Sequence, residues 1–139
     1  MTYDIISKRT RKSLIVKHPD VLFKFLKRYT KSRQEQFFVI TINGSNEVIG
    51  IHIATIGIAN KTIVHPREIF IHAITDNAVA VIIAHNHPSS NLKPSLEDIE
   101  ITKRLKDAGE LLGIYVLDHL IINKKEYYSF KQERDILQY

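Results

Sequence analysis

Apolar residues at helical spacing mark two segments of the chain, and each of these segments begins at a proline. The first runs from residue 19 to 31 and the second from 66 to 75. Proline suits the first turn of a helix because its missing N–H would have no partner there. Both segments are therefore predicted to be amphipathic helices. Their apolar positions are Val21, Leu22, Phe25, Leu26 and Tyr29 in the first, and Ile69, Phe70, Ala73 and Ile74 in the second.

Runs of β-branched and aromatic residues predict strands between these helices. Residues 37–42 and 48–53 flank the turn-forming residues 43–46, and this pattern predicts a β-hairpin. Residues 79–84 form a continuous apolar run, which is typical of a central strand buried on both faces. Two shorter extended segments are predicted at 13–16 and 62–65.

A third helical pattern begins at Ser95, and Gly113 is placed to end it. Its apolar positions are Ile99, Ile101, Leu105, Ala108, Leu111 and Leu112. Residues 114–122 then predict a strand, and 127–130 predict an edge strand. Because strands and helices alternate, the fold class is predicted to be α/β, with a single mixed β-sheet flanked by helices.

The composition matches one compact folded domain of 139 residues, with 44% hydrophobic and 25% charged residues. The chain has no cysteine, so a disulfide framework, a thiolate zinc site and a cysteine nucleophile are all excluded. The longest uncharged apolar stretch, residues 78–84, is too short to span a bilayer, and residues 1–4 do not resemble a signal peptide. We therefore expect a cytoplasmic protein with no membrane partner.

The formal net charge is +5, and basic residues are dense at 8–12 and 27–33. Such a surface can bind nucleic acid or an acidic protein. Binding to nucleic acid is favoured because neutralisation of its phosphates releases counterions. Charge runs are more often only solvated surface, and we favour that interpretation here.

The chemistry of the chain centres on two histidines, His85 and His87. At the end of an extended strand, residues two apart project from the same face, so the two imidazoles are predicted to converge. Asp98 lies in the first turn of the third predicted helix, where it can point back at the pair. Two imidazoles and a carboxylate suit zinc, although Mn, Fe and Co also bind such sets. Ser95 and Asp98 also fit the roles of N-cap and acidic first-turn residue, and the two roles are compatible.

The spacing of these residues resembles a known signature. The run His85-x-His87-Pro88 is followed by Ser95 and Asp98, with seven residues between His87 and Ser95 and two between Ser95 and Asp98. This pattern is similar to the JAMM motif of MPN/JAB-domain metalloproteases. The surrounding residues 64–68, 84–89 and 117–119 are similar to RadC-like proteins. The resemblance extends from about residue 35 to residue 122.

The resemblance implies a cytidine-deaminase-like layered sandwich over residues 35–139, with residues 1–34 as a basic arm and helix of the same domain. It implies one zinc ion held by His85, His87 and Asp98, with water as the fourth ligand. Ser95 would assist the reacting carbonyl of a peptide or isopeptide bond. The glutamate that activates water in this family falls on Glu35, and the competing candidates are Glu47, Glu68, Glu97 and Glu100.

Three other interpretations remain open beside a zinc metallopeptidase of unknown peptide or protein substrate. The letters of His85-Asn86-His87 match a string known from metal-dependent endonucleases, but those enzymes need a ββα-metal hairpin that is not predicted here. A non-catalytic binding module would keep the fold but lack some of the metal ligands of the motif, and this sequence retains all of them. A DNA-repair role would use the same metal site and bind nucleic acid through the basic N-terminal region. His119 is expected to be structural or to support a ligand, and His65 to fix a turn.

Overall fold

The computed structural model describes residues 3–6, 14–31, 35–56, 64–87 and 91–137. The strands are β1 (Tyr3–Ile6), β2 (Gln36–Ile42), β3 (Val48–Ile56), β4 (Ala80–Asn86), β5 (Tyr115–Ile122) and β6 (Tyr127–Ser129). The helices are α1 (Pro19–Leu26), α2 (Pro66–Thr75), α3 (Leu96–Leu112) and α4 (Phe130–Glu133), with 3-10 turns η1 (Lys27–Lys31) and η3 (Asp135–Leu137).

The six strands form one sheet in the order β1-β3-β2-β4-β5-β6. The neighbours β4 and β5 are parallel, and the other four pairings are antiparallel. This arrangement confirms the predicted single mixed sheet flanked by helices. Among the described residues of the first 34, β1 pairs with β3, and α1 packs against the sheet.

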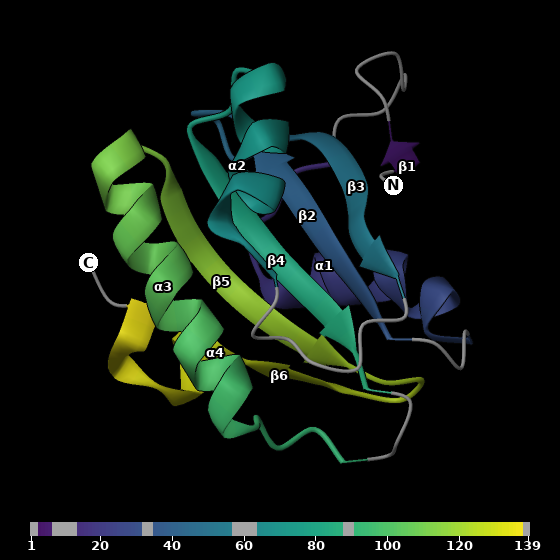
Figure 1. Ribbon diagram of the computed structural model, residues 1–139. Helices are drawn as coiled ribbons and strands as arrows, with labels where there is room; N and C mark the ends of the chain where they lie inside the picture. Colours follow the sequence, from purple (N-terminus) through teal and green to yellow (C-terminus); the bar gives the residue numbers. More distant parts are fainter. Residues whose placement is uncertain (1–2, 7–13, 32–34, 57–63, 88–90, 138–139) are drawn as a thin grey trace.

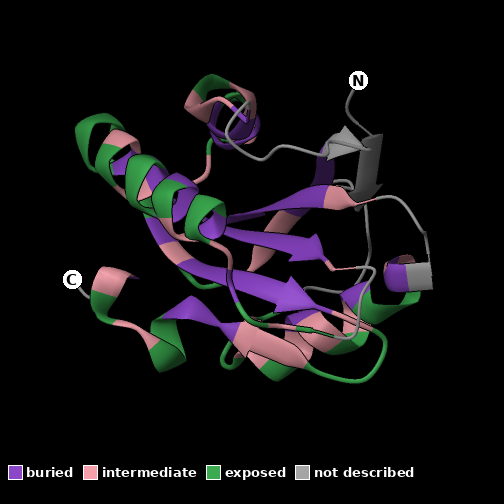
Figure 2. Cartoon of the chain, turned by 60° about the horizontal axis from the view of Figure 1, so that its bottom comes forward, coloured by how far each residue is buried: buried purple, intermediate pink, exposed green. Residues whose placement is uncertain are grey.

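Helices cover both faces of the sheet. Figure 1 shows α2 and α3 in front of the strands and α1 behind them. The buried residues accordingly form two apolar clusters, one under α2 and α3 and the other under α1. Figure 2 shows that burial is concentrated in the strands, whereas the outward side of α3 is exposed. The sheet is therefore the middle layer of a three-layer sandwich.

Most predicted elements are present, with local differences at their ends. The helix α2 has the predicted bounds, and the predicted helix 19–31 changes from α to 3-10 after Leu26. The helix α3 begins after Ser95 and ends at Gly113, whose φ of 72° is left-handed. Ile15 forms a single bridge with Glu47 in place of the strand predicted at 13–16. Residues 13, 62 and 63 lie outside the described residues, and 64–65 form no strand.

Three apolar residues assigned to buried helix faces are exposed instead. Ile74 is 62% exposed in the last turn of α2, and Leu111 and Leu112 are 91% and 52% exposed at the end of α3. The buried positions of α3 include Leu105 and Gly109. Leu111 lies two residues after Gly109 and so projects from the opposite side of the helix.

The strand β4 is buried at every position, as expected for the centre of a sheet. It begins at Ala80 and ends at Asn86, whereas residues 79–84 were predicted, and Val79 is exposed. His85 is therefore part of the strand itself, which fixes the direction of its side chain. No helix in the described part of the chain is long and apolar enough to cross a membrane.

Candidate metal centre

The candidate centre lies where β4 ends and α3 begins, at the lower end of the sheet in Figure 1. His85 is fully buried in β4, and His87 follows the strand. Their Nε2 atoms are 3.0 Å apart. The strand alternation thus brings the two imidazoles together on one face, as the sequence predicts.

Asp98 reaches the same point from the first turn of α3. Its Oδ1 lies 3.3 Å from His85 Nε2, and its Oδ2 lies 3.6 Å from His87 Nε2. Ser95 holds this carboxylate through a reciprocal capping box, in which Ser95 N–H donates to Asp98 Oδ2 and Asp98 N–H donates to Ser95 Oγ. The N-cap role predicted for Ser95 is confirmed, and the cap orients Asp98 toward the histidines.

The separations between these atoms can be compared with a tetrahedral metal shell. Zinc binds imidazole nitrogen and carboxylate oxygen at about 2.0–2.2 Å, so two ligand atoms in a tetrahedron lie about 3.3–3.6 Å apart. The two imidazole nitrogens are 3.0 Å apart, slightly closer than this, and they lie 3.3 and 3.6 Å from the two different carboxylate oxygens of Asp98. The donor set and its spacing therefore fit a small divalent cation.

Glu35 lies beside the histidine pair, just before β2. Phe37 in β2 pairs with His85, and Glu35 lies two residues earlier, so alternation places both side chains on the face of His85. Glu35 Oε1 is 3.9 Å from His85 Nε2, and the Glu35 side chain is 21% exposed. Glu35, His85 and His87 each offer a ligand atom within 4.8 Å of the other two.

The other glutamates considered for catalysis have separate places in the fold. Glu68 Oε2 accepts a hydrogen bond from His65 N–H at the start of α2, where His65 is the N-cap residue. Glu47 Oε1 accepts from Asn43 Nδ2 in the β2–β3 hairpin. Glu97 and Glu100 are exposed on α3. Of the five candidates, Glu35 is the one that the structure brings to the histidines.

Asn86, between the two histidines, was given no role by sequence reasoning. Its side chain is fully buried, and its Oδ1 accepts a 2.6 Å hydrogen bond from Gln36 N–H. This contact replaces the next rung of the β2–β4 ladder, because the paired residues end at Phe37 and His85. Asn86 therefore ties the segment that carries Glu35 to the end of β4.

The tautomer of His87 follows from its hydrogen bond. Its Nδ1 lies 2.9 Å from the carbonyl oxygen of Asn91. A carbonyl oxygen only accepts, so His87 Nδ1 carries the proton and donates it. His87 Nε2 therefore presents a lone pair on the side where His85 and Asp98 lie, which is the state that a metal requires.

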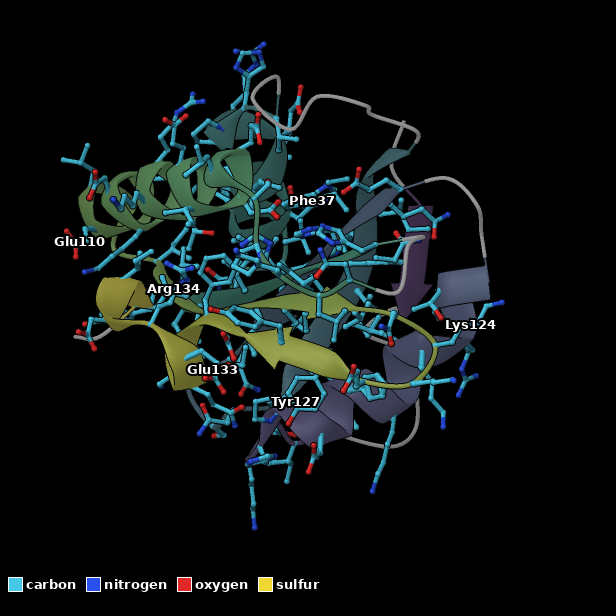
Figure 3. The ribbon with its side chains drawn as sticks, turned by 90° about the horizontal axis from the view of Figure 1, so that it is seen from below. Phe37, Glu110, Lys124, Tyr127, Glu133 and Arg134 are labelled. Atoms are coloured by element: carbon cyan, nitrogen blue, oxygen red, sulfur yellow. The ribbon has the colours of Figure 1, made fainter. Side chains whose placement is uncertain are left out.

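A layer of buried rings supports the centre from within the fold. Phe37 stacks on His85 with 5.4 Å between ring centroids and an interplanar angle of 4°. His119 Nε2 lies 2.8 Å from His85 Nδ1, and Phe130 stacks on His119 at 4.8 Å. Figure 3 shows Phe37 in the interior, among the side chains between α3 and the strands. The structure thus places His119 in contact with a candidate ligand.

Asp118, the neighbour of His119, anchors this layer. Its carboxylate accepts hydrogen bonds from Ser129 Oγ, from Lys131 N–H and from His119 N–H. Burial raises the pKa of Asp118 above its ordinary value, because desolvation of the charged form outweighs these hydrogen bonds. The contacts to Ser129 and Lys131 hold the start of α4, and with it Phe130, against His119.

Comparison with known proteins agrees with the family resemblance of the sequence. A family model described as the RadC-like JAB domain matches residues 16–136. The chain is 52% identical over 98 residues to a UPF0758 protein of Methanospirillum hungatei, a match that covers 70% of this chain and 44% of that protein. It is 49% identical over 121 residues to a UPF0758 protein of Alkaliphilus metalliredigens, covering 85% and 51% respectively. The chain spans about half the length of these relatives.

Proposed function

The chain belongs to the family of RadC-like JAB domains, and on that premise we propose that it is a metal-dependent hydrolase that cleaves a peptide or isopeptide bond. The observation that carries the proposal is the convergence of His85, His87 and Asp98 at separations of 3.0 to 3.6 Å. Glu35 Oε1 lies 3.9 Å from His85 Nε2. A JAMM-type metallopeptidase needs this combination of ligands and a base.

One zinc ion is the metal that we propose, held by His85 Nε2, His87 Nε2 and Asp98; Mn, Fe and Co suit the same donors. Asp98 is preferred to Glu35 as the third ligand because it is fully buried and lies closer to both imidazoles. When bound, the metal would polarise the scissile carbonyl and lower the pKa of a water molecule to about 7.

Glu35 is the proposed proton carrier. Its carboxylate lies beside the ligands and its side chain is 21% exposed, so it can take a proton from the attacking water and give one to the leaving amine. Ser95 is the proposed donor to the substrate carbonyl. Its Oγ accepts the Asp98 N–H, which leaves the hydroxyl hydrogen for the oxygen that becomes negative.

Hydrolysis can be tested without a known substrate. We expect the zinc-loaded protein to cleave a mixture of random decapeptides and ε-linked lysine isopeptides, with products identified by mass spectrometry. Removal of the metal by a chelator is expected to abolish cleavage, and added zinc to restore it. Cleavage that survives metal removal, or no cleavage of either substrate class by the loaded protein, would argue against the proposal.

A nucleic-acid partner is the second candidate, and a basic groove favours it. A groove of about 610 Å³ is lined by Lys24, Lys27, Arg28 and Lys124. Figure 3 shows Lys124 on the turn between β5 and β6, beside α1. Four cations around one groove can neutralise successive phosphates of a nucleic-acid strand. In this second proposal the protein binds nucleic acid and keeps the same metal site.

The expected signature is salt-dependent binding of a labelled single-stranded oligonucleotide, measured by fluorescence anisotropy. The variant Lys24→Glu with Lys124→Glu should reduce the slope of log affinity against log salt by about 1.4, which corresponds to two lost phosphate contacts. The control, Lys103→Glu with Arg104→Glu on α3, has the same net charge and should keep the slope. Equal effects of the two double variants, or no binding at low salt, would refute this role.

A further inference from the structure

We propose that His119 and Thr102 are positioning residues that fix the tautomer of His85, so that His85 Nε2 presents its lone pair to the metal. This inference rests on the metal-dependent function proposed above, but its first test needs no metal. It assigns a purpose to two fully buried polar side chains that lie behind the candidate ligands.

The proton positions follow from a chain of three short contacts. Thr102 Oγ1 donates to the carbonyl oxygen of Asp98 at 2.6 Å, and it lies 2.6 Å from His119 Nδ1. His119 Nε2 lies 2.8 Å from His85 Nδ1. The carbonyl only accepts, so the single Thr102 proton goes to it, and the Thr102 oxygen accepts from His119 Nδ1–H.

The remaining protons are then determined. Because a neutral imidazole carries one N–H, His119 with its proton on Nδ1 has a lone pair on Nε2. That lone pair accepts from His85 Nδ1–H, which leaves His85 Nε2 without a proton and turned toward His87 and Asp98. The metal-facing nitrogen of His85 is thus set by a backbone carbonyl three hydrogen bonds away.

The reverse arrangement is unfavourable in this geometry. If Thr102 donated to His119 Nδ1, the Thr102 oxygen and the Asp98 carbonyl oxygen would face each other at 2.6 Å with no proton between them. His119 would then donate to His85 Nδ1, and His85 Nε2 would be protonated and unable to bind a metal. Two oxygens at this distance without a proton between them repel each other, which favours the first arrangement. The first arrangement leaves the lone pairs of His85 Nε2 and His87 Nε2 3.0 Å apart, where a bound cation would offset their repulsion.

A local irregularity in β5 puts His119 in this place. Val81 pairs with Val116, but the next residue, Ile82, pairs with Asp118, so Leu117 is an extra residue in the ladder. Strict alternation from Val116 would turn His119 toward α1. The extra residue reverses the phase, so His119 pairs with Ile83 and faces the same side as His85.

The contacts also link the two kinds of ligand. Thr102 lies one turn after Asp98 on α3 and bonds its carbonyl, while His119 bonds His85 on β4. With a metal bound between His85 and Asp98, the hydrogen bonds through Thr102 and His119 would complete a closed ring of contacts. This ring would connect α3 to β4. Outer partners of this kind orient ligating imidazoles in metal sites. His87 has its own fixed donor contact, to Asn91.

The first test is the tautomer of His119 in metal-free wild-type protein. Nitrogen-15 NMR of the imidazoles at about pH 8, above the ordinary histidine pKa of about 6.5, distinguishes the two neutral forms. His119 and His85 are both expected as the Nδ1–H form. An Nε2–H form of His119 would overturn the inference, whether or not the protein binds metal.

The second test is zinc affinity, measured by competition with a chromophoric chelator. Thr102→Val removes the hydroxyl at nearly constant volume and should weaken zinc binding by about 10- to 100-fold. Thr102→Ser keeps the hydroxyl and should stay within about threefold of wild type. The matched control is Thr41→Val, which removes a buried hydroxyl that donates to Asp76 away from the centre; it should also stay within about threefold.

The outcomes separate a positioning role from a structural one. Loss of affinity in Thr102→Val alone supports the inference. Wild-type affinity in Thr102→Val, or an equal loss in Thr102→Ser or Thr41→Val, overturns it. If Thr102→Val does not fold, the NMR tautomer of the wild type decides. A wild-type protein that binds no zinc refutes the proposed function, and the His119 tautomer still tests the inference separately.

Discussion

Glu35→Gln is expected to keep metal binding and to slow peptide hydrolysis by about 10²- to 10⁴-fold, the range that general acid–base catalysis contributes. Glutamine has nearly the same shape but cannot accept a proton from water at neutral pH. Metal binding should persist because Glu35 Oε1 lies 3.9 Å from His85 Nε2, farther than either contact between Asp98 and a histidine. The measurements are metal content and the cleavage rate of the best peptide from the mixture.

The matched control for this prediction is Glu97→Gln, an equal change of charge at an exposed position on α3. It should leave both metal content and rate near the wild-type values. If Glu35→Gln lost the metal, Glu35 would be a ligand instead of the base. If it kept the full rate, another group would have to carry the proton.

Asp98→Asn is expected to weaken zinc binding by more than about 100-fold, because it removes the anionic ligand itself. About 100-fold is the upper range for loss of a residue that only hydrogen-bonds to a ligand. The substitution is a sharp test because the asparagine Oδ1 can still accept Ser95 N–H and so preserve the start of α3. Circular dichroism should therefore show unchanged helix content while competition with a chelator shows weaker zinc binding.

His85→Ala should lose zinc to a similar extent, since it removes the imidazole that lies closest to the other ligands. Glu97→Gln, next to Asp98 in the same turn, again provides the control and should bind zinc as wild type does. Undiminished zinc binding by both Asp98→Asn and His85→Ala would place the metal elsewhere.

Local patterns in the sequence predicted the parts of the centre that depend on local geometry. The convergence of His85 and His87 follows from the alternation of a strand, and the place of Asp98 follows from the capping of α3 by Ser95. These arguments involve residues at most a few positions apart. They needed no knowledge of how the strands pair.

The position of Glu35 was obtained from the family resemblance, and its physical cause is not local. It depends on β2 lying next to β4 in the register that pairs Phe37 with His85, and on the hydrogen bond from Gln36 N–H to Asn86. Residues 50 positions apart make that bond. Single-sequence patterns carry no information on such a register, which is also why Asn86 was overlooked.

The sequence left open whether His119 is structural or supports a ligand, and the reason is related. Alternation along 114–122 assigns each residue to a face only if the strand is regular. The extra residue at Leu117 reverses that assignment for His119, and nothing in its flanking apolar residues signals the change. Sequence analysis gave Thr102 no role, because its partner His119 lies 17 residues away on another element.

The endonuclease interpretation of residues 85–87 can now be weighed against the fold. That chemistry would require a β-hairpin and helix around a metal, whereas His85 lies in the centre of a six-stranded sheet and a 17-residue helix follows. The side chain of Asn86 bonds Gln36 N–H and serves to hold β2. The fold of the described residues around His85 therefore does not match the hairpin that the endonuclease interpretation requires.

The most direct test of a metal held by His85, His87 and Asp98 is X-ray absorption at the zinc edge, on protein loaded with one equivalent of zinc. The expected spectrum is that of four-coordinate zinc with two imidazole nitrogens at about 2.0–2.1 Å and oxygen in the remaining positions. A shell of oxygen alone, or one with a single imidazole, would contradict the assignment.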